Sequence, residues 1–171
     1  MMRATSGITV ETQGADRQAF RRNVSLFATG VVVISCADEL GGHVHGMTVN
    51  SFTSLSLDPP TVIVSLKAGR AHELIGKSGR FGASVLNEAQ QMYSNHFSGM
   101  RDTGLAPEFA VRERVHTLAD CLAWFECEVT RAIDIHDHTL FVARVTACGG
   151  QEGSPLMFFA SRYHFPSIAG E

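Results

Sequence analysis

The residues best suited to chemistry form one polar segment, residues 46–60. Hydroxyl and amide side chains crowd its first half, at Thr48, Asn50 and Ser51, and Asp58-Pro59-Pro60 closes it. These side chains and the backbone N–H groups between them are neutral hydrogen-bond donors. Such donors suit the carbonyls and nitrogens along the edge of a flavin ring, and they equally suit phosphate oxygens. On composition alone, a polar connection between two strands explains the segment as well.

A second pattern with chemical potential is a pair of HxH motifs, His43/His45 and His136/His138. Residues two apart on a strand point to the same face, so four imidazoles on a small barrel could bind a transition metal. This pattern favours a metal-dependent oxygenase or isomerase as an alternative function. A third group of ligands is missing from the sequence, which leaves the proposed metal site incomplete.

The elements that position these residues begin with a helix over residues 16–27. Phe20, Val24 and Phe27 recur there at helical spacing, and Asp16 is placed to cap the helix. A β-branched run at 31–36, a turn at 38–42 and a strand from His43 then predict a β-hairpin.

Strands predominate in the rest of the chain. Asp58-Pro59-Pro60 cannot continue a sheet ladder, so it separates two expected strands. Further strands are expected at 54–57, 61–66, 81–86, 124–133, 139–147 and 156–159, helices at 70–76 and 88–97, and a loop at 98–115. Hairpins outnumber crossovers, and no GxGxxG follows an expected strand. The sequence therefore predicts a mainly β protein, an antiparallel barrel with peripheral helices, and not a doubly wound parallel sheet.

Composition limits the possible functions further. A chain of 171 residues that is 44% hydrophobic fits one globular domain, residues 16–171, after a disordered leader at 1–15. A net charge of −3 with scattered basic residues argues against nucleic acid as a partner. No apolar stretch is long enough to span a bilayer, and no signal peptide begins the sequence. The four cysteines form no CxxC pair and are expected to be reduced, small buried residues of a cytoplasmic protein.

The polar segment closely resembles the flavin-binding segment of the short-chain flavin reductase family, whose fold is a homodimeric split β-barrel. Other segments resemble this family in the same order along nearly the whole chain: residues 27–31, 81–86, 136–141, and 154–159 with 162–164. Each segment alone is a weak signal, but their common order identifies the chain as a member of the family.

Within the family, residues 44–67, 123–128 and 158–164 resemble the styrene monooxygenase branch. This resemblance implies that hydride passes from NADH to FAD, with FMN as a possible flavin, and that reduced FAD goes to a partner FAD-dependent monooxygenase. It also implies a homodimer. A flavin-binding carrier without turnover remains the non-enzymatic alternative.

The resemblance also assigns site residues. By this resemblance, His138 and Tyr163 are expected to position the nicotinamide. Their role is positioning because hydride transfer needs the two rings stacked without water between them, and no protein acid or base. Most family members have Gly where this chain has His136. The flavin is expected to contact Thr29, Met47, Thr48, Val49, Asn50, Ser51, Ser65, Leu66, Lys67, Arg70, His72, Ser84, Val85 and Phe97. Among these, Lys67 is the expected partner of the flavin phosphates.

Overall fold

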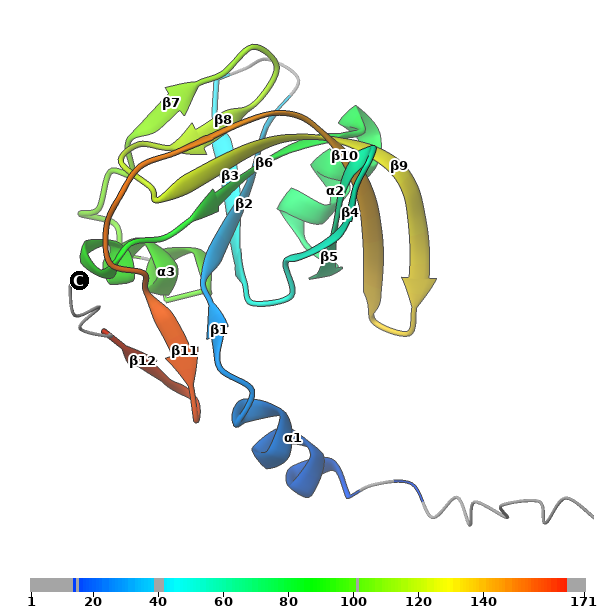
Figure 1. Cartoon of the computed structure of the whole chain (residues 1–171), viewed down its shortest axis with the longest axis vertical. Helices are drawn as coiled ribbons and strands as arrows, with labels where there is room; N and C mark the ends of the chain where they lie inside the picture. The colour runs from blue at the N-terminus through cyan, green and yellow to red at the C-terminus, as the bar shows by residue number, and fades with distance from the viewer. Residues whose placement is uncertain (1–13, 15, 39–41, 101, 166–171) are drawn as a thin grey trace, which may run out of the picture.

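The structure is a computed structural model that describes residues 14, 16–38, 42–100 and 102–165 (Figure 1). The leader expected at residues 1–15 therefore lies outside the described residues, apart from Gly14. No helix of the described residues is long and apolar enough to cross a membrane.

Helices are few. They are α1 (Arg17–Ser25), α2 (Arg70–Ser78), the 3₁₀ turn η1 (Glu88–Gln90) and α3 (Gln91–Phe97). The strands are β1 (Thr29–Gly30), β2 (Val32–Ala37), β3 (Val44–Val49), β4 (Thr53–Leu57), β5 (Pro60–Lys67), β6 (Arg80–Val85), β7 (Phe109–Val111), β8 (His116–Leu118), β9 (Ala123–Ile135), β10 (His138–Gly150), β11 (Met157–Phe159) and β12 (Arg162–His164).

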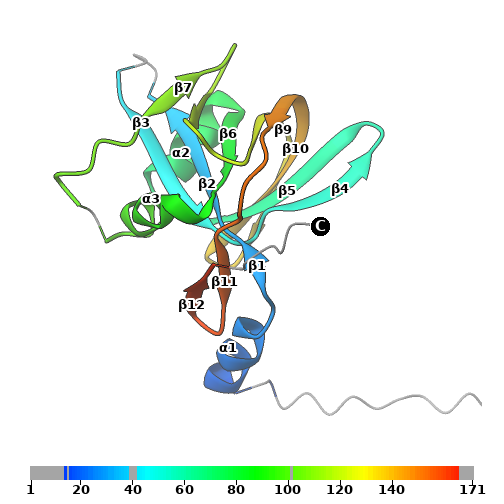
Figure 2. The same ribbon diagram turned by 60° about the vertical axis from the view of Figure 1, so that its left-hand side comes forward.

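The main sheet has seven strands in the order β3-β2-β6-β9-β10-β5-β4. All of its pairings are antiparallel, and β3 and β4 are left as edges instead of pairing with each other. Figure 2 shows the β4–β5 hairpin diverging from β2, β3 and β6. The sheet is therefore a split barrel, which confirms the predicted fold class. Two smaller sheets complete the fold, β1-β11-β12 and β7-β8.

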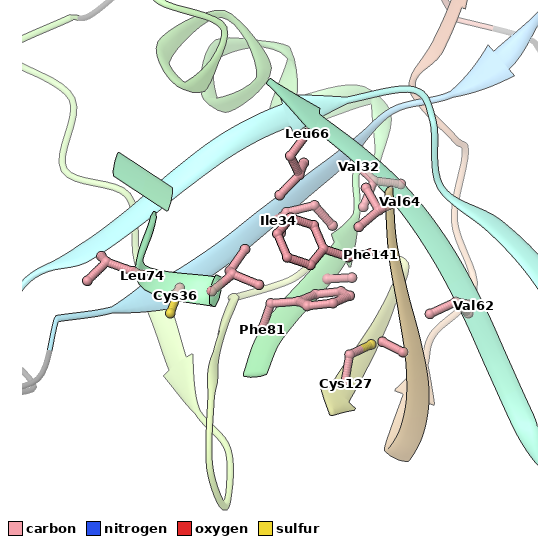
Figure 3. Packing of buried hydrophobic residues seen from close by; sticks show 13 residues of the cluster. Val32, Ile34, Cys36, Val62, Val64, Leu66, Leu74, Phe81, Cys127 and Phe141 are labelled. Carbon is pink, nitrogen blue, oxygen red and sulfur yellow. The ribbon is translucent and has the colours of Figure 1, made fainter. Parts of the chain in front are cut away.

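The main core fills the inside of this barrel. Alternate residues of a strand point to one face, and alternate residues of β2, β5 and β10 meet here with the ring of Phe81 (Figure 3). Leu74 and Ile75 of α2 close one end of the same cluster. The helix buries these side chains because its apolar positions lie on one face, and this packing fixes where its N-terminus begins.

A second core lies on the other face of β2. Val31 and Val33 pack there with Leu86, Leu118 and Leu156, so the first strand run is buried on both faces. Side chains of α3, β11 and β12 border this cluster, including Phe97 and Tyr163. This core brings the C-terminal hairpin against α3.

The structure differs from the sequence prediction at the end of α1 and in several short strands. Helix α1 ends at Ser25, before the predicted boundary at residue 27, because Leu26 and Phe27 close its last turn through backbone bonds. Strand β7 lies inside the expected loop, and the short strands β1, β8 and β12 were not among the expected strands. Strands of three residues are too short to show an alternating pattern.

Candidate functional site

The polar segment leaves β3 and turns into β4. The Thr48 hydroxyl donates a 2.7 Å hydrogen bond to the carbonyl of Ser94 in α3. The Ser51 hydroxyl donates to the Ser65 carbonyl at 3.0 Å and accepts from the Ser65 N–H at 3.1 Å. Within the described chain, the exposed amide of Asn50 makes no hydrogen bond. The segment therefore has two side chains that fix its course and one that is available to a ligand.

Tyr163 is tied to the same helix as Thr48. Its phenolic oxygen lies 2.8 Å from the hydroxyl of Ser94, which is fully buried. Its ring packs edge-to-face on Phe158, with the centroids 5.4 Å apart. Ser94 thus connects a residue expected to bind flavin with one expected to position nicotinamide.

Lys67, Asp137 and His138 form a polar cluster where β5 and β10 begin to separate. His138 pairs with Lys67 in the ladder between these strands. His138 Nδ1 lies 2.8 Å from Asp137 Oδ1, and Lys67 Nζ lies 3.5 Å from Asp137 Oδ2. The hydrogen bond from His138 and the charges nearby hold the pKa of Asp137 below its ordinary value.

His72 belongs to a second, separate set of hydrogen bonds, with Thr139 and Asp134. The Thr139 hydroxyl donates to Asp134 at 2.8 Å, so it accepts from His72 Nε2, also at 2.8 Å. The His72 ring meets Phe141 edge-on at 5.5 Å. These contacts attach the first turn of α2 to β10.

A groove of about 730 Å³ runs between β3, the start of α2, α3 and the loop before β7. Met47, Arg70 and Phe97 line it, so it contains three of the residues expected to contact flavin. The wall is tight at Gly46, where a Cβ would lie 2.5 Å from Cδ1 of Phe97. The volume falls in the range of small-molecule sites.

Helix α2 begins beside the groove without a side-chain cap. Its N-cap is Gly69, two residues after β5 ends at Lys67, and within the described residues no side chain caps it. Arg70 pairs with Glu73 at 3.4 Å, and both side chains are exposed. A helix N-terminus with free N–H groups and basic side chains nearby is a typical phosphate-binding arrangement, and α2 has Lys67 and Arg70 near its start.

Other expected site residues lie deeper. Ser84 is fully buried and its hydroxyl accepts from the Leu118 N–H at 2.9 Å. Leu66 is fully buried in the main core, and Val49 and Val85 pack against that core. These side chains contribute to core packing, which holds in place the strands that carry the site.

Thr29 supplies the clearest test of fit for a flavin. Its Oγ1 is buried without a hydrogen-bond partner within the described residues. Together with the Asn50 amide, this hydroxyl is a neutral donor with an unmet bond, and the ring edge of a flavin offers neutral acceptors. The donor set therefore fits the group that the sequence implied.

The two HxH motifs are on different elements. His43 precedes β3 and His45 lies in it, with ring centroids 4.6 Å apart, whereas His136 lies in the β9–β10 turn and His138 begins β10. In the part of the chain that the structure describes, no three His, Cys, Asp or Glu side chains gather as metal ligands. The metal hypothesis gains no support from this arrangement.

Three of the four cysteines are buried, as expected for small apolar residues, and Cys148 is exposed. Burial raises the pKa of Cys127 to about 12 and also raises the pKa values of Cys36 and Cys121. These three thiols are therefore poor nucleophiles at neutral pH.

Sequence reasoning missed Ser94, Thr139 and Asp134. Ser94 lies between Tyr93 and Asn95 on a short helix, and nothing in the sequence marks it as the fully buried residue that it is in the structure. The roles of Thr139 and Asp134 depend on the hairpin register, which side-chain types alone do not reveal.

Comparison with known proteins places this geometry in a family. Residues 24–167 match the model of the flavin reductase like domain. The NADH-dependent flavin reductase StyB of Pseudomonas fluorescens is 56% identical over 153 residues, covering 87% of this chain and 89% of that protein.

Solved structures agree. The styrene monooxygenase flavin reductase SMOB from Pseudomonas putida S12 has a TM-score of 0.82 and 56% identity, over 87% of this chain and 97% of that one. The NADH:FAD oxidoreductase SgcE6 of Streptomyces globisporus, solved with NAD and FAD fragments, has a TM-score of 0.78 and 29% identity, over 91% and 96%. This chain belongs to the flavin reductase family.

Proposed function

We propose that this chain transfers a hydride from NADH to FAD and releases the reduced FAD to a styrene-type monooxygenase. One observation carries the proposal: strand β5 links the two expected binding sites. Its Ser65 is bonded to Ser51 of the polar segment, and two residues further on, Lys67 pairs with His138. A flavin held by the polar segment would therefore lie beside the residue expected to position nicotinamide.

The names of the relatives support the choice of substrates. StyB is described as NADH-dependent, SMOB as the flavin reductase of a styrene monooxygenase, and SgcE6 as an NADH:FAD oxidoreductase. The identity of 56% with the first two covers most of both chains, so we infer the same reductant and the same kind of oxygenase partner here. FMN remains a second flavin to be tested.

Each residue of the site has a binding role in this proposal. Asn50 and Thr29 donate to the flavin ring, Lys67 and Arg70 with the start of α2 hold its phosphates, and His138 and Tyr163 orient the nicotinamide. A bound flavin supplies the hydride acceptor itself. The protein's contribution is to hold the two rings in contact and exclude water between them.

We also propose a symmetric homodimer. Phe20, Val24 and Phe27 lie at i, i+4 and i+7, and they are 61%, 53% and 74% exposed. Helix α1 has no buried residue, and Figures 1 and 2 show it beyond β1 and β12, away from the main sheet. An apolar helix face of this kind supports contact with a second copy. We place the enzyme in the cytoplasm, where NADH is kept and free thiols stay reduced.

Steady-state kinetics tests the function. We expect purified protein to oxidise NADH only when free flavin is added, with FAD preferred over FMN and riboflavin and NADH over NADPH. EDTA should leave the rate unchanged. Activity that is lost with chelator and restored by iron or zinc would instead support the metal enzyme. Stoichiometric flavin binding without turnover would support the carrier.

A further inference from the structure

The tip of the β9–β10 hairpin carries a carboxylate that the proposed function does not use. Strand β9 ends at Ile135 and β10 begins at His138, so His136 and Asp137 form the turn. The turn places the Asp137 carboxylate against the imidazole of His138 at 2.8 Å, with Lys67 of β5 on its other side at 3.5 Å. Asp137 thus lies between a cation and the expected nicotinamide residue.

The hydrogen bond defines which nitrogen of His138 carries a proton. An ionised carboxylate only accepts hydrogen bonds, so Nδ1 must be the donor. In the neutral ring, the other nitrogen, Nε2, then has a lone pair and no proton. The same bond and the nearby charge of Lys67 lower the pKa of Asp137, which keeps its carboxylate ionised at neutral pH.

The surrounding charged groups are committed to other partners. On β9, Asp134 accepts from Thr139, and on α2, His72 bonds to the same hydroxyl. Arg70 and Glu73 of α2 pair with each other. Asp137 is therefore the carboxylate that acts directly on His138, and Lys67 is the cation that steadies Asp137. Both side chains of the Lys67–Asp137 pair are about two-thirds exposed. This ion pair therefore orients the Asp137 carboxylate and adds little to the stability of the fold.

We propose that Asp137 is a positioning residue that holds His138 in the Nδ1–H tautomer, so that Nε2 presents a lone pair to the carboxamide N–H of the nicotinamide. This inference rests on the proposed function, in which His138 contacts NADH. A ring in the opposite tautomer would present an N–H to that N–H and lose the hydrogen bond. Asp137 acts through His138 and does not itself need to touch NADH.

The variant Asp137→Asn tests the tautomer directly. Asparagine carries no charge, and its amide can donate to Nδ1 as well as accept from it, so the carboxylate's preference for the Nδ1–H form of His138 is lost. In ¹⁵N NMR spectra of the full-length protein at about pH 8.5, where histidine is ordinarily neutral, we expect Nδ1 of wild-type His138 to show the shift of a protonated nitrogen. In Asp137→Asn the two nitrogens should share the proton, so the Nδ1 shift should move toward that of an unprotonated nitrogen. The His138 signals are assigned by their loss in His138→Ala.

Kinetics tests the consequence. Asp137→Asn should raise the KM for NADH about three- to tenfold, the range expected for one neutral hydrogen bond, and leave the flavin dissociation constant unchanged. The double variant Asp137→Asn/His138→Ala should be no worse than His138→Ala alone, because Asp137 works through His138. Glu113→Gln, which removes one surface carboxylate from the loop after β7, is the control for charge and should leave both constants unchanged.

The outcomes separate this inference from the proposed function. If wild-type protein fails to reduce flavin with NADH, the function is wrong. If the wild type is active but Asp137→Asn keeps both its NADH KM and the Nδ1–H tautomer, the positioning role is wrong. Additive effects of Asp137→Asn and His138→Ala would also overturn it, since Asp137 would then act independently of His138.

Discussion

The hydroxyl of Ser94 lies 2.8 Å from the phenolic oxygen of Tyr163, and this bond joins α3 to the C-terminal β11–β12 hairpin. Through its carbonyl, Ser94 also accepts the hydrogen bond of Thr48. One buried residue therefore couples the polar segment to the hairpin that carries Tyr163. Its loss should loosen Tyr163 without removing a core side chain.

We expect Ser94→Ala to lower the free energy of unfolding by about 1–2 kcal/mol, because the Tyr163 hydroxyl is left without its partner. Tyr163→Phe should cost a similar amount, and the double variant little more than either alone. Chemical denaturation measures all three. Tyr93→Phe is the matched control, since its hydroxyl makes no hydrogen bond to any residue that the structure describes, and the change should be near zero. Fully additive losses would show that the two hydroxyls do not interact.

The polar segment should separate binding from stability. Asn50→Ala removes an exposed amide that has no hydrogen bond within the described part of the chain, so it should weaken FAD binding by roughly 0.5–1.5 kcal/mol and leave thermal unfolding unchanged. Ser51→Ala and Thr48→Ala remove internal bonds and should lower the melting temperature as well. Flavin fluorescence titration and thermal melts distinguish the two classes. Unchanged FAD affinity in Asn50→Ala would exclude its amide from the flavin site.

Much of the fold followed from local patterns. The side chain of Asp16 accepts from the Ala19 N–H at 2.8 Å, so the predicted cap of α1 is confirmed. The β-branched run became β2, buried on both faces, and Pro60 stands at the first position of β5, where a missing N–H does least harm. These features depend on neighbours in sequence, which is why composition and spacing revealed them.

The remainder depends on long-range pairing. Strand β6 inserts between β2 and β9, and β10 pairs with both β9 and β5, so residues far apart in sequence become neighbours. Periodicity does not fix this order. The contacts of Ser94 with Tyr163 and of His72 with Thr139 arise only once the strands are ordered. For the same reason, the sequence suggested ligand roles for His72 and Ser84 without showing that both already have partners inside the protein.

His136 should be replaceable by glycine with a gain in stability. Its φ is 57°, a left-handed conformation that costs a residue with a Cβ roughly 1–2 kcal/mol. Glycine relieves this strain, but it also raises the entropy of the unfolded chain, which offsets part of the gain. His136→Gly should therefore raise the free energy of unfolding by a net amount of roughly 0.5–1 kcal/mol. NADH and flavin kinetics should not change. A loss of NADH affinity would give the His136 side chain a role in the site.

Glu128 and Arg144 should make stability depend on pH. The Arg144 guanidinium donates to Glu128 at 2.8 Å and holds the pKa of that carboxyl below its ordinary value of 4.5. A carboxyl with a lowered pKa stabilises the folded state above that value, and the contribution is lost as the pH falls through the folded-state pKa. Glu128→Gln should melt below wild type at pH 7 and match it in strong acid. Arg144→Gln should give the same pattern. A difference that persists in acid would assign the loss to packing.

The apolar face of α1 should control assembly. Phe20 and Val24 are more than half exposed, yet α1 buries no residue of its own, so their replacement removes no core contact in one chain. We expect wild-type protein to sediment as a dimer at micromolar concentration and Phe20→Ser/Val24→Ser to sediment as a monomer with an unchanged circular dichroism spectrum. Arg21→Ser changes an exposed polar residue of the same helix and should leave the dimer intact. A wild-type monomer would contradict the homodimer, whereas a dimer that survives Phe20→Ser/Val24→Ser would place the interface on another surface.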